Sequence, residues 1–229
     1  KRRSQVAPQT GVSAGVYVFS GPYIQMAGTP LADAVNTARV GGIYFGPMPF
    51  PRLSLTHVPQ IGSAQSWPSL VYLAAASFIG GTDLAAGLGL DPRALQSLKE
   101  FGNTVTWHEV AHQWWGHQVG WASYRDQWLS EGFADFSASL FLQFTNKTME
   151  QYNKFWENSR VGLFERNALG KRPNEAGAIW MGFRLASDKV PDAYARVVYN
   201  KGGYVLNMLR WMMWDQKERD RYFIAMMRD

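Results

Sequence analysis

The residues whose types and spacing suit chemistry lie in the segment Trp107–Gly116, which has the sequence WHEVAHQWWG. His108 and His112 are four residues apart, so on a helix both imidazoles lie on the same side, one turn apart along the axis. Two such rings can bind one cation, and their geometry suits zinc. Glu109 lies on the flank of the pair, where its carboxylate can take a proton from a water molecule without binding the metal. The pattern predicts a metal site with Glu109 as general base.

A catalytic zinc needs a third protein ligand and an open position, and a carboxylate is a known partner of two histidines. Glu131 is the best candidate, because it follows His112 after 18 residues and begins the next predicted helix. A loop over His117–Gln127 is long enough to bring that helix back beside the first. Asp135, one turn beyond Glu131, is predicted to accept the second N–H of a ligating histidine and fix its orientation, with a solvated helix carboxylate as the alternative. A structural zinc site is disfavoured, because such sites usually have four protein ligands.

The distribution of histidines along the chain argues against a chance occurrence of the pair. The chain has four, and three of them lie within ten residues. His117 falls past the expected helix end, which we place near Gly116, and is interpreted as a surface or supporting histidine. His57, in a strand-like run, is expected to be an ordinary hydrogen-bonded histidine. Asn103 is a candidate cap for the start of the metal helix.

Composition narrows the class of protein. The 229 residues are 46% hydrophobic, which favours one large domain or two lobes over disorder. A net charge of +5 without a basic stripe or a recognition motif argues against nucleic-acid binding. The absence of cysteine excludes thiolate metal sites, disulfides and cysteine nucleophiles but leaves the compartment open. No stretch is long and apolar enough to predict a membrane span, and the chain is interpreted as a piece of a longer protein.

The order of patterns along the chain predicts an α+β fold. Residues 1–80 are rich in Gly and Pro, with strand-like runs at Gly15–Phe19 and Arg52–Val58 around a helical pattern at Leu31–Phe45. They are expected to form a small β-containing lobe, and residues 81–229 a larger helical lobe that carries the metal site, with the cleft between the lobes as the active site. Helical periodicity marks five segments in the second part: Pro92–Phe101, Thr104–His117, Leu129–Phe144, Met149–Phe164 and Gly203–Trp214.

Three blocks of the sequence resemble the aminopeptidase N family of zinc metallopeptidases, within the thermolysin-like gluzincins. The first is HEVAHQWWG followed by WLSEGFADF, and the second is VYNKG at residues 198–202. The resemblance implies a thermolysin-like catalytic domain with one zinc ion as cofactor. It also implies that Tyr199 hydrogen-bonds the tetrahedral intermediate, a role in which a phenol shares the charge of a developing oxyanion.

The third block, PRLSLTHVP at residues 51–59 and then GSAQSW, is similar to the family's substrate-binding strand and the loop after it. That likeness implies that Gly62, Ser63, Ala64 and Gln65 contact the substrate. Gln65 stands where the family has the glutamate that binds the substrate's free amino group, and Ser66 replaces the asparagine after it. An amide oxygen offers an ammonium only a neutral hydrogen bond, so strict aminopeptidase specificity stays open.

The expected activity is hydrolysis of a peptide substrate, most simply near its amino terminus. An endopeptidase or oligopeptidase of the same family is the alternative that Gln65 favours. A catalytically silent homologue that only binds is the alternative from another class, although its expected mark, the loss of a ligand, the base or the tyrosine, is not seen. Substrate side-chain preference and oligomeric state are not indicated by the sequence.

Overall fold

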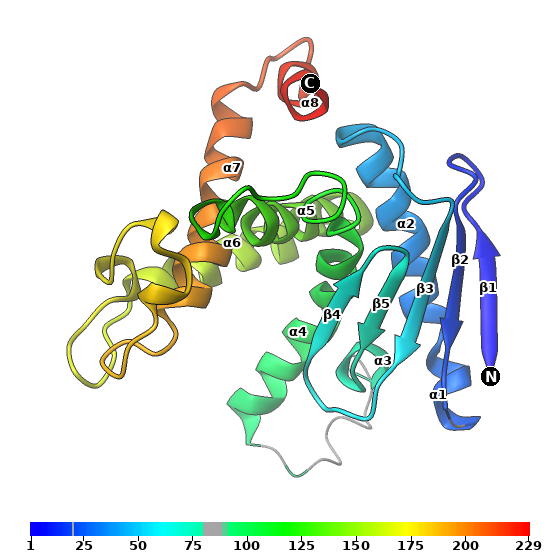
Figure 1. Ribbon diagram of the computed structural model, residues 1–229, viewed down its shortest axis with the longest axis horizontal. Coiled ribbons are helices and arrows are strands. Elements are labelled where there is room, and N and C mark those ends of the chain that lie inside the picture. Colours follow the sequence, from blue (N-terminus) through cyan, green and yellow to red (C-terminus); the bar gives the residue numbers. More distant parts are fainter. Residues whose placement is uncertain (20, 80–88, 90) are drawn as a thin grey trace. The chain divides into compact units, whose positions relative to one another are not determined.

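The computed structural model describes residues 1–19, 21–79, 89 and 91–229. The chain forms two compact units, Lys1–Gln113 and Trp114–Asp229, each with its own internal packing (Figure 1). The lobe boundary expected between residues 80 and 81 lies outside the described residues. The α+β fold class predicted from the sequence is confirmed, because a mixed sheet occupies the first unit and helices make up most of the second.

The first unit contains a five-stranded sheet in the order β1-β2-β3-β5-β4. The central strand β3 pairs in parallel with β2 and β5, whereas β1 and β4 pair antiparallel with their neighbours. Apolar side chains at alternate positions, such as Leu53 and Leu55 on β3, are buried, which is the period of a half-buried strand. The strands are β1 (Arg2–Val6), β2 (Ser13–Tyr17), β3 (Arg52–His57), β4 (Ala64–Trp67) and β5 (Leu70–Leu73).

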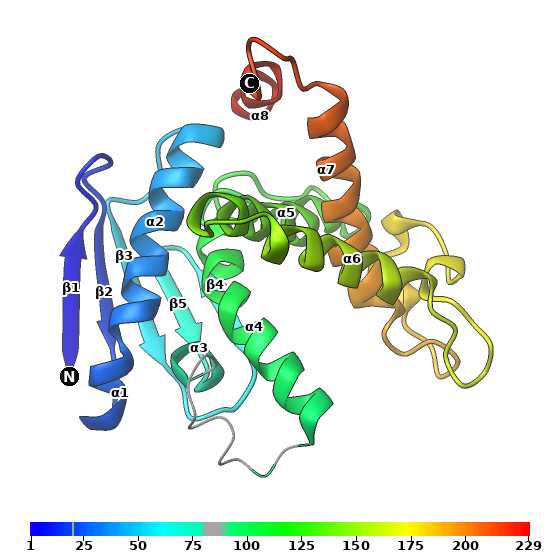
Figure 2. The same ribbon diagram turned by 180° about the vertical axis from the view of Figure 1, so that it is seen from behind.

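Helices α2 and α4 lie on one face of this sheet (Figure 2). Small buried residues on α2, among them Ala34 and Ala38, let the helix approach the strands closely. Among the described residues of the unit, the helices are α1 (Gly21–Met26), α2 (Gly28–Tyr44), α3 (Ala76–Ile79) and α4 (Pro92–Ala111). The helix predicted at Leu31–Phe45 is confirmed by α2.

The helix that carries the histidines is longer at its start and shorter at its end than the sequence pattern indicated. A single helix, α4, runs over Pro92–Ala111, where two separate segments were expected. Asn103 therefore lies inside the helix, and its predicted role as a cap is wrong. Gly102 does not break the helix, because the cost of about 1 kcal/mol for an internal glycine is smaller than the gain from packing one apolar face. The helix ends at Ala111, five residues before Gly116, which adopts a positive φ of 122° in the following turn.

The second unit is built around α5, against which α6, the π-helical segment η5 and α7 pack. Phe136 and Phe141 of α5 are fully buried, and Phe136 meets Phe223 of α8 edge-on at 5.3 Å between ring centroids. Short turns fill the region between α6 and η5. The elements are η2 (Tyr124–Asp126), α5 (Trp128–Thr145), α6 (Glu150–Phe164), η3 (Pro173–Glu175), η4 (Ile179–Leu185), η5 (Ala195–Lys201), α7 (Gly202–Met212) and α8 (Arg221–Arg228).

Two glycines set the distance between α5 and α7. A Cβ placed on Gly132 would lie 2.8 Å from the Cα of Gly202, and a Cβ on Gly202 would lie 3.0 Å from the Cα of Gly132. The two backbones are thus in direct contact, which only glycine permits. Glu131 immediately precedes the first of these glycines, and Tyr199 lies three residues before the second, so this contact fixes the elements that carry both side chains.

None of the helices in the described part of the chain combines the length and the hydropathy of a membrane span.

Candidate metal centre

The last turns of α4 carry His108 and Glu109, and His112 follows one residue after the helix ends. The backbone N–H of His112 still donates to the carbonyl of His108, at 3.3 Å, so the helical spacing of the pair is kept. The two imidazole rings are nearly perpendicular, at 81°, and their Nε2 atoms are 3.2 Å apart. Two nitrogens bound at about 2.0–2.1 Å to one tetrahedral ion lie about 3.3 Å apart. The imidazole pair therefore has the spacing of two ligands of a single cation.

The residues between the histidines anchor the end of the helix. Val110 and Ala111 are fully buried, which turns the histidine side of the helix away from the core of the first unit. Glu109 is also buried, with 7% of its surface exposed, although it is an acid. Acids are rarely buried to this extent unless they have polar partners. Its burial at the flank of the histidine pair suits a carboxylate that exchanges a proton at the site.

Gln113 connects this helix end to the sheet and was not predicted from the sequence. Its fully buried amide accepts from the backbone N–H of Ser69 at 2.8 Å and donates to Ser66 Oγ at 2.9 Å and to the Trp67 carbonyl at 3.1 Å. One side chain thus holds the turn between β4 and β5 immediately beside His112. The sequence signal for Gln113 was its position directly after a predicted ligand. Its hydrogen-bond partners lie 44 to 47 residues away in sequence, so the pattern did not reveal them.

The predicted substrate loop ends in the edge strand of the sheet. Gly62 and Ser63 precede β4, while Ala64 and Gln65 are its first two residues. Gln65 is exposed, and its Nε2 donates to the carbonyl of Ser66 at 3.3 Å. The side-chain oxygen Oε1 is therefore the acceptor that Gln65 can offer to a substrate. Within the described residues β4 pairs with β5 alone, so its outer edge is a place where an extended peptide can add to the sheet.

His57 differs from its sequence-based interpretation. Its ring is 5% exposed, and within the described residues neither ring nitrogen has a hydrogen-bond partner, so the expected hydrogen-bonded histidine is wrong. Aromatic side chains surround it instead, with ring centroids at 4.0 Å for Tyr23, 5.1 Å for Phe78 and 5.9 Å for Phe19. Burial lowers the pKa of His57 below its usual 6.5, so the neutral ring is favoured.

In the second unit, Glu131 lies in the first turn of α5. The N–H groups of Ser130 and Glu131 both donate to the Gln127 carbonyl, which closes that turn. The Ser130 hydroxyl donates to the Trp115 carbonyl at 3.1 Å, and the ring of Trp115 packs on Phe133 at 4.6 Å. The start of α5 is therefore tied to the segment that follows the histidine helix. A carboxylate in a first turn is also favoured by the helix dipole.

Tyr199 lies on the π-helical segment η5 and is half-buried beside Glu131. Burial raises the pKa of Tyr199 far above its ordinary value of 10, and the negative charge of Glu131 and the neighbouring Tyr194 raise it further. Burial likewise raises the pKa of Tyr194 to about 12. A raised pKa favours the protonated phenol, which can donate a hydrogen bond. A π-helical turn at such a position is a common feature of functional sites.

Asp135, the expected supporting carboxylate, lies one turn after Glu131 on α5. Its Oδ2 accepts a hydrogen bond at 3.1 Å from Nδ2 of Asn200, the residue after Tyr199. Arg196 Nη1 in turn donates to Asn200 Oδ1 at 3.3 Å. The first of these hydrogen bonds fastens η5 to α5, and the second lies within η5. The predicted role of Asp135 as partner of a ligating histidine stays a prediction.

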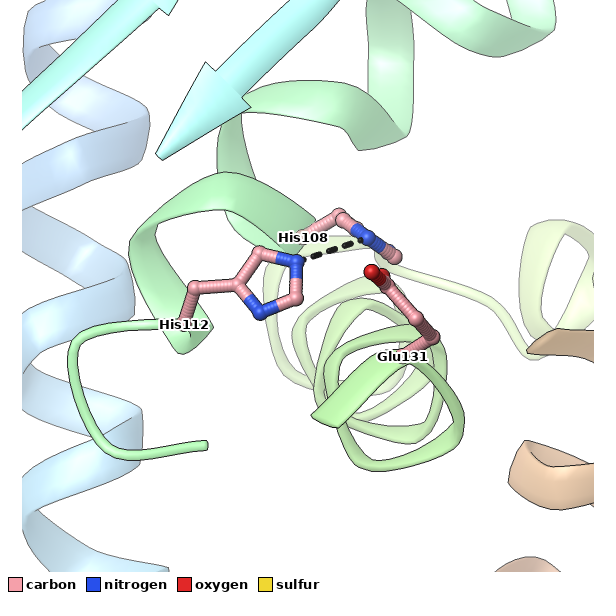
Figure 3. A group of neighbouring side chains, drawn as sticks. All are labelled: His108, His112 and Glu131. Carbon is pink, nitrogen blue, oxygen red and sulfur yellow. Dashed lines mark hydrogen bonds between the residues drawn. The ribbon is translucent and has the colours of Figure 1, made fainter. Parts of the chain in front are cut away.

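The three predicted ligands form one group. His108, His112 and Glu131 each offer one ligand atom, and these atoms lie within 4.8 Å of one another (Figure 3). Two imidazoles and one carboxylate are a donor set that catalytic zinc sites use, with the fourth position left for water or substrate. The residues present therefore fit a divalent cation of this type.

A histidine pair one helical turn apart, a carboxylate from another helix and a protonated phenol beside it define the class of metal-dependent hydrolases. Comparison with known proteins gives the family. Residues 88–221 match the model described as the peptidase family M1 domain, which is more than half of the chain. The chain belongs to peptidase family M1, and the resemblance predicted from its motifs is confirmed.

Relatives and solved structures agree with this family. Human endoplasmic reticulum aminopeptidase 1 is 27% identical over 210 residues, which are 88% of this chain and 20% of that protein. Bovine endoplasmic reticulum aminopeptidase 2 is 28% identical over 165 residues, 71% of this chain and 16% of that protein. The crystal structure of the M1 zinc metallopeptidase from Deinococcus radiodurans shares the fold, with a TM-score of 0.61 at 21% identity over 99% of this chain and 44% of that one. The chain spans about a fifth of the length of the curated relatives it matches.

Proposed function

We propose that this chain is the catalytic part of a zinc-dependent peptidase that removes residues from the amino terminus of peptides. The observation that carries the proposal is the group formed by His108, His112 and Glu131 in a member of peptidase family M1. The matched relatives are named aminopeptidases, and the solved neighbour is a zinc metallopeptidase, which supports the same assignment.

Each polar residue near the proposed ligands has a role in this reaction. Zinc, when bound, supplies Lewis acidity that activates water and polarises the scissile carbonyl. Glu109 accepts a proton from the attacking water and returns it to the leaving nitrogen. Tyr199, which stays protonated, donates a hydrogen bond to the oxyanion of the tetrahedral intermediate. Glu131 and Tyr199 are held side by side by the contact between Gly132 and Gly202.

Gln65 bears on whether the substrate needs a free amino terminus. A neutral Oε1 binds an ammonium more weakly than a carboxylate does, by roughly half of a charge-assisted hydrogen bond. An oligopeptidase that accepts blocked or internal positions is the second candidate function, and the exposed position of Gln65 on the edge strand favours it.

The deciding experiment uses the full-length protein that contains this chain. Zinc content is measured by elemental analysis, and hydrolysis is followed for one peptide with a free amino terminus and for its acetylated form, with and without a chelator. An aminopeptidase cleaves the free peptide only, an oligopeptidase cleaves both, and a chelator abolishes either activity. Bound zinc without hydrolysis of either peptide would instead identify a silent homologue. Gln65→Glu is the matched variant, and it should lower KM for the free peptide alone if Gln65 meets the amino group.

A further inference from the structure

Two arginines of the second unit share a single exposed indole ring. The guanidinium carbons of Arg125 and Arg184 lie 5.5 Å and 5.7 Å from the ring centroid of Trp180. Arg125 belongs to η2, whereas Trp180 and Arg184 belong to η4, and η2 and η4 pack against each other. A Cβ on the buried Gly182 would lie 3.1 Å from the Tyr124 carbonyl oxygen, so the backbones of the two elements nearly touch. The cluster is therefore assembled by the fold and does not depend on one flexible side chain.

Neither guanidinium has an acidic partner within the described part of the chain. The nearest acid in sequence, Asp126, accepts a hydrogen bond from the Ser123 hydroxyl at 3.0 Å. Arg184 Nε donates to the Met181 carbonyl at 3.3 Å, which leaves its outer nitrogens for a ligand. Both arginines are exposed. Two like charges held on one ring without a counter-ion make a place where a carboxylate is favoured.

A line of aromatic contacts connects this cluster with the metal centre. Phe183, between Trp180 and Arg184 in sequence, stacks on Tyr194 with ring centroids 4.2 Å apart and planes at 17°. Tyr194 meets Tyr199 edge-on at 5.7 Å, and Tyr199 adjoins Glu131. All of these residues belong to the second unit. The exposed rings of Phe183 and Trp180 can therefore support a peptide that extends from the zinc ligand toward the arginines.

We propose that Arg125, Trp180 and Arg184 form a subsite for a carboxylate of the peptide substrate. This inference rests on the proposed function and names a substrate class for it: peptides with an acidic group beyond the cleaved bond. Both guanidinium groups lie over the indole ring, and a guanidinium group can bind a carboxylate in a bidentate manner through its N–H edge. Such a carboxylate can be an Asp or Glu side chain or the free carboxyl terminus, and the two are separated by experiment.

The test compares peptides of equal length that share their first residue. One carries Gln in the middle and an amidated carboxyl terminus, the second replaces Gln by Glu, and the third keeps Gln but has a free carboxyl terminus. The full-length wild-type protein should bind one or both acidic peptides with KM roughly three- to fivefold lower than the neutral peptide. Substitutions Arg125→Gln and Arg184→Gln should each reduce this preference, with kcat and the neutral peptide unaffected. Equal KM for all three peptides in the wild type would overturn the proposal.

Arg219→Gln is the matched control. Arg219 also lies over an indole of the second unit, with its guanidinium carbon 5.4 Å from the ring of Trp214 near α8. If Arg219→Gln lowers the preference for acidic peptides as much as Arg184→Gln does, the net charge of the protein explains the preference and the proposed subsite is wrong. Raising the salt concentration should weaken the preference of the wild type, because exposed ion pairs are screened.

Failure of the proposed function can be told apart from failure of this inference. If no peptide is hydrolysed, the peptidase assignment fails, and the subsite is tested through binding of fluorescently labelled Glu and Gln peptides followed by anisotropy. Tighter binding of the Glu peptide that disappears in Arg184→Gln would support the subsite in a non-catalytic protein. Equal binding of both peptides would refute the subsite in that case. Where the peptides are hydrolysed, equal KM values refute the subsite and leave the peptidase assignment standing.

Discussion

Gly132 on α5 and Gly202 at the start of α7 are in backbone contact, with room for no side chain between them. Glu131 and Tyr199 owe their positions to this contact, because each is within three residues of one of the glycines. The distance between a proposed metal ligand and a proposed oxyanion donor is thus set by two residues that do no chemistry themselves.

Gly132→Ala should damage both stability and turnover. The new methyl would meet the Gly202 backbone at 2.8 Å, and a backbone cannot move aside as a flexible side chain does. Overpacking of this kind costs about 1–3 kcal/mol, and a shift of Tyr199 of about 1 Å can lower kcat about a hundredfold. Urea unfolding and peptide hydrolysis measure the two effects. In the control Gly120→Ala the new methyl has its nearest neighbour at 3.9 Å, so wild-type behaviour is expected.

Glu109→Gln should separate metal binding from catalysis. The substitution keeps the shape of the buried side chain but removes the base, so kcat should fall about a hundredfold to ten-thousandfold. Zinc content should stay at the wild-type level, because the three proposed ligands are intact. Elemental analysis and hydrolysis of an unblocked peptide test both parts, and wild-type turnover in this variant would disprove the assignment of the base.

Tyr199→Phe should act on kcat with little change in KM. The ring contacts with Tyr194 are kept, while the hydrogen bond to the oxyanion, which forms only in the transition state, is lost. Loss of one such donor lowers kcat about a hundredfold to a thousandfold. Tyr204→Phe, on α7 and packed on Trp156, serves as the matched control. A change confined to KM in Tyr199→Phe would show that the phenol only binds substrate.

His57 should make the first unit sensitive to acid. Its folded-state pKa is depressed by burial, so its contribution to stability is present above the unfolded pKa of 6.5 and is lost as pH falls through the folded pKa. Between these two values the free energy of unfolding should fall by about 1.4 kcal/mol per pH unit. His57→Phe keeps the aromatic packing and should lack this slope.

Asp33 contributes to the pH dependence of the free energy of unfolding with the opposite sign. Burial raises its pKa to about 6, so its stabilising effect is lost as pH rises through that value. The informative quantity is therefore the difference between wild type and His57→Phe at each pH, in which the Asp33 contribution cancels. Urea unfolding from pH 5 to pH 7.5 measures it. If the two proteins show the same pH dependence, protonation of His57 is not coupled to unfolding.

Most of the elements that position the site could be predicted from the sequence, because their sequence patterns are local. Spacing along one helix is enough to pair His108 with His112, and a short return loop is enough to bring Glu131 toward them. Periodicity also located α2, α5, α6 and α7 to within a few residues. Element ends were less accessible, as α4 shows, since packing rather than propensity decides where a helix stops.

Features that depend on contacts between residues far apart in sequence could not be predicted. The amide of Gln113 has no meaning in sequence until β4 and β5 are folded beside it. The two glycines in contact lie 70 residues apart, and neither resembles a site residue by itself. For His57 the error had the same source, because the aromatic rings that surround it come from three other segments of the chain.

A single deletion can remove the π-helical turn that carries Tyr199. A π turn holds about one residue more than an α turn, so removing one residue from Ala195–Val198 would let the segment close into a regular helix. Side chains after the deletion would rotate by about 100° around the helix axis relative to those before it. Because Gly202 stays packed against Gly132, the rotation would fall on the residues before Tyr199, and the ring of Tyr194 that meets Tyr199 edge-on would turn away. The loss of one codon would thus remove a neighbour of the phenol without any visible change in the metal-binding motif.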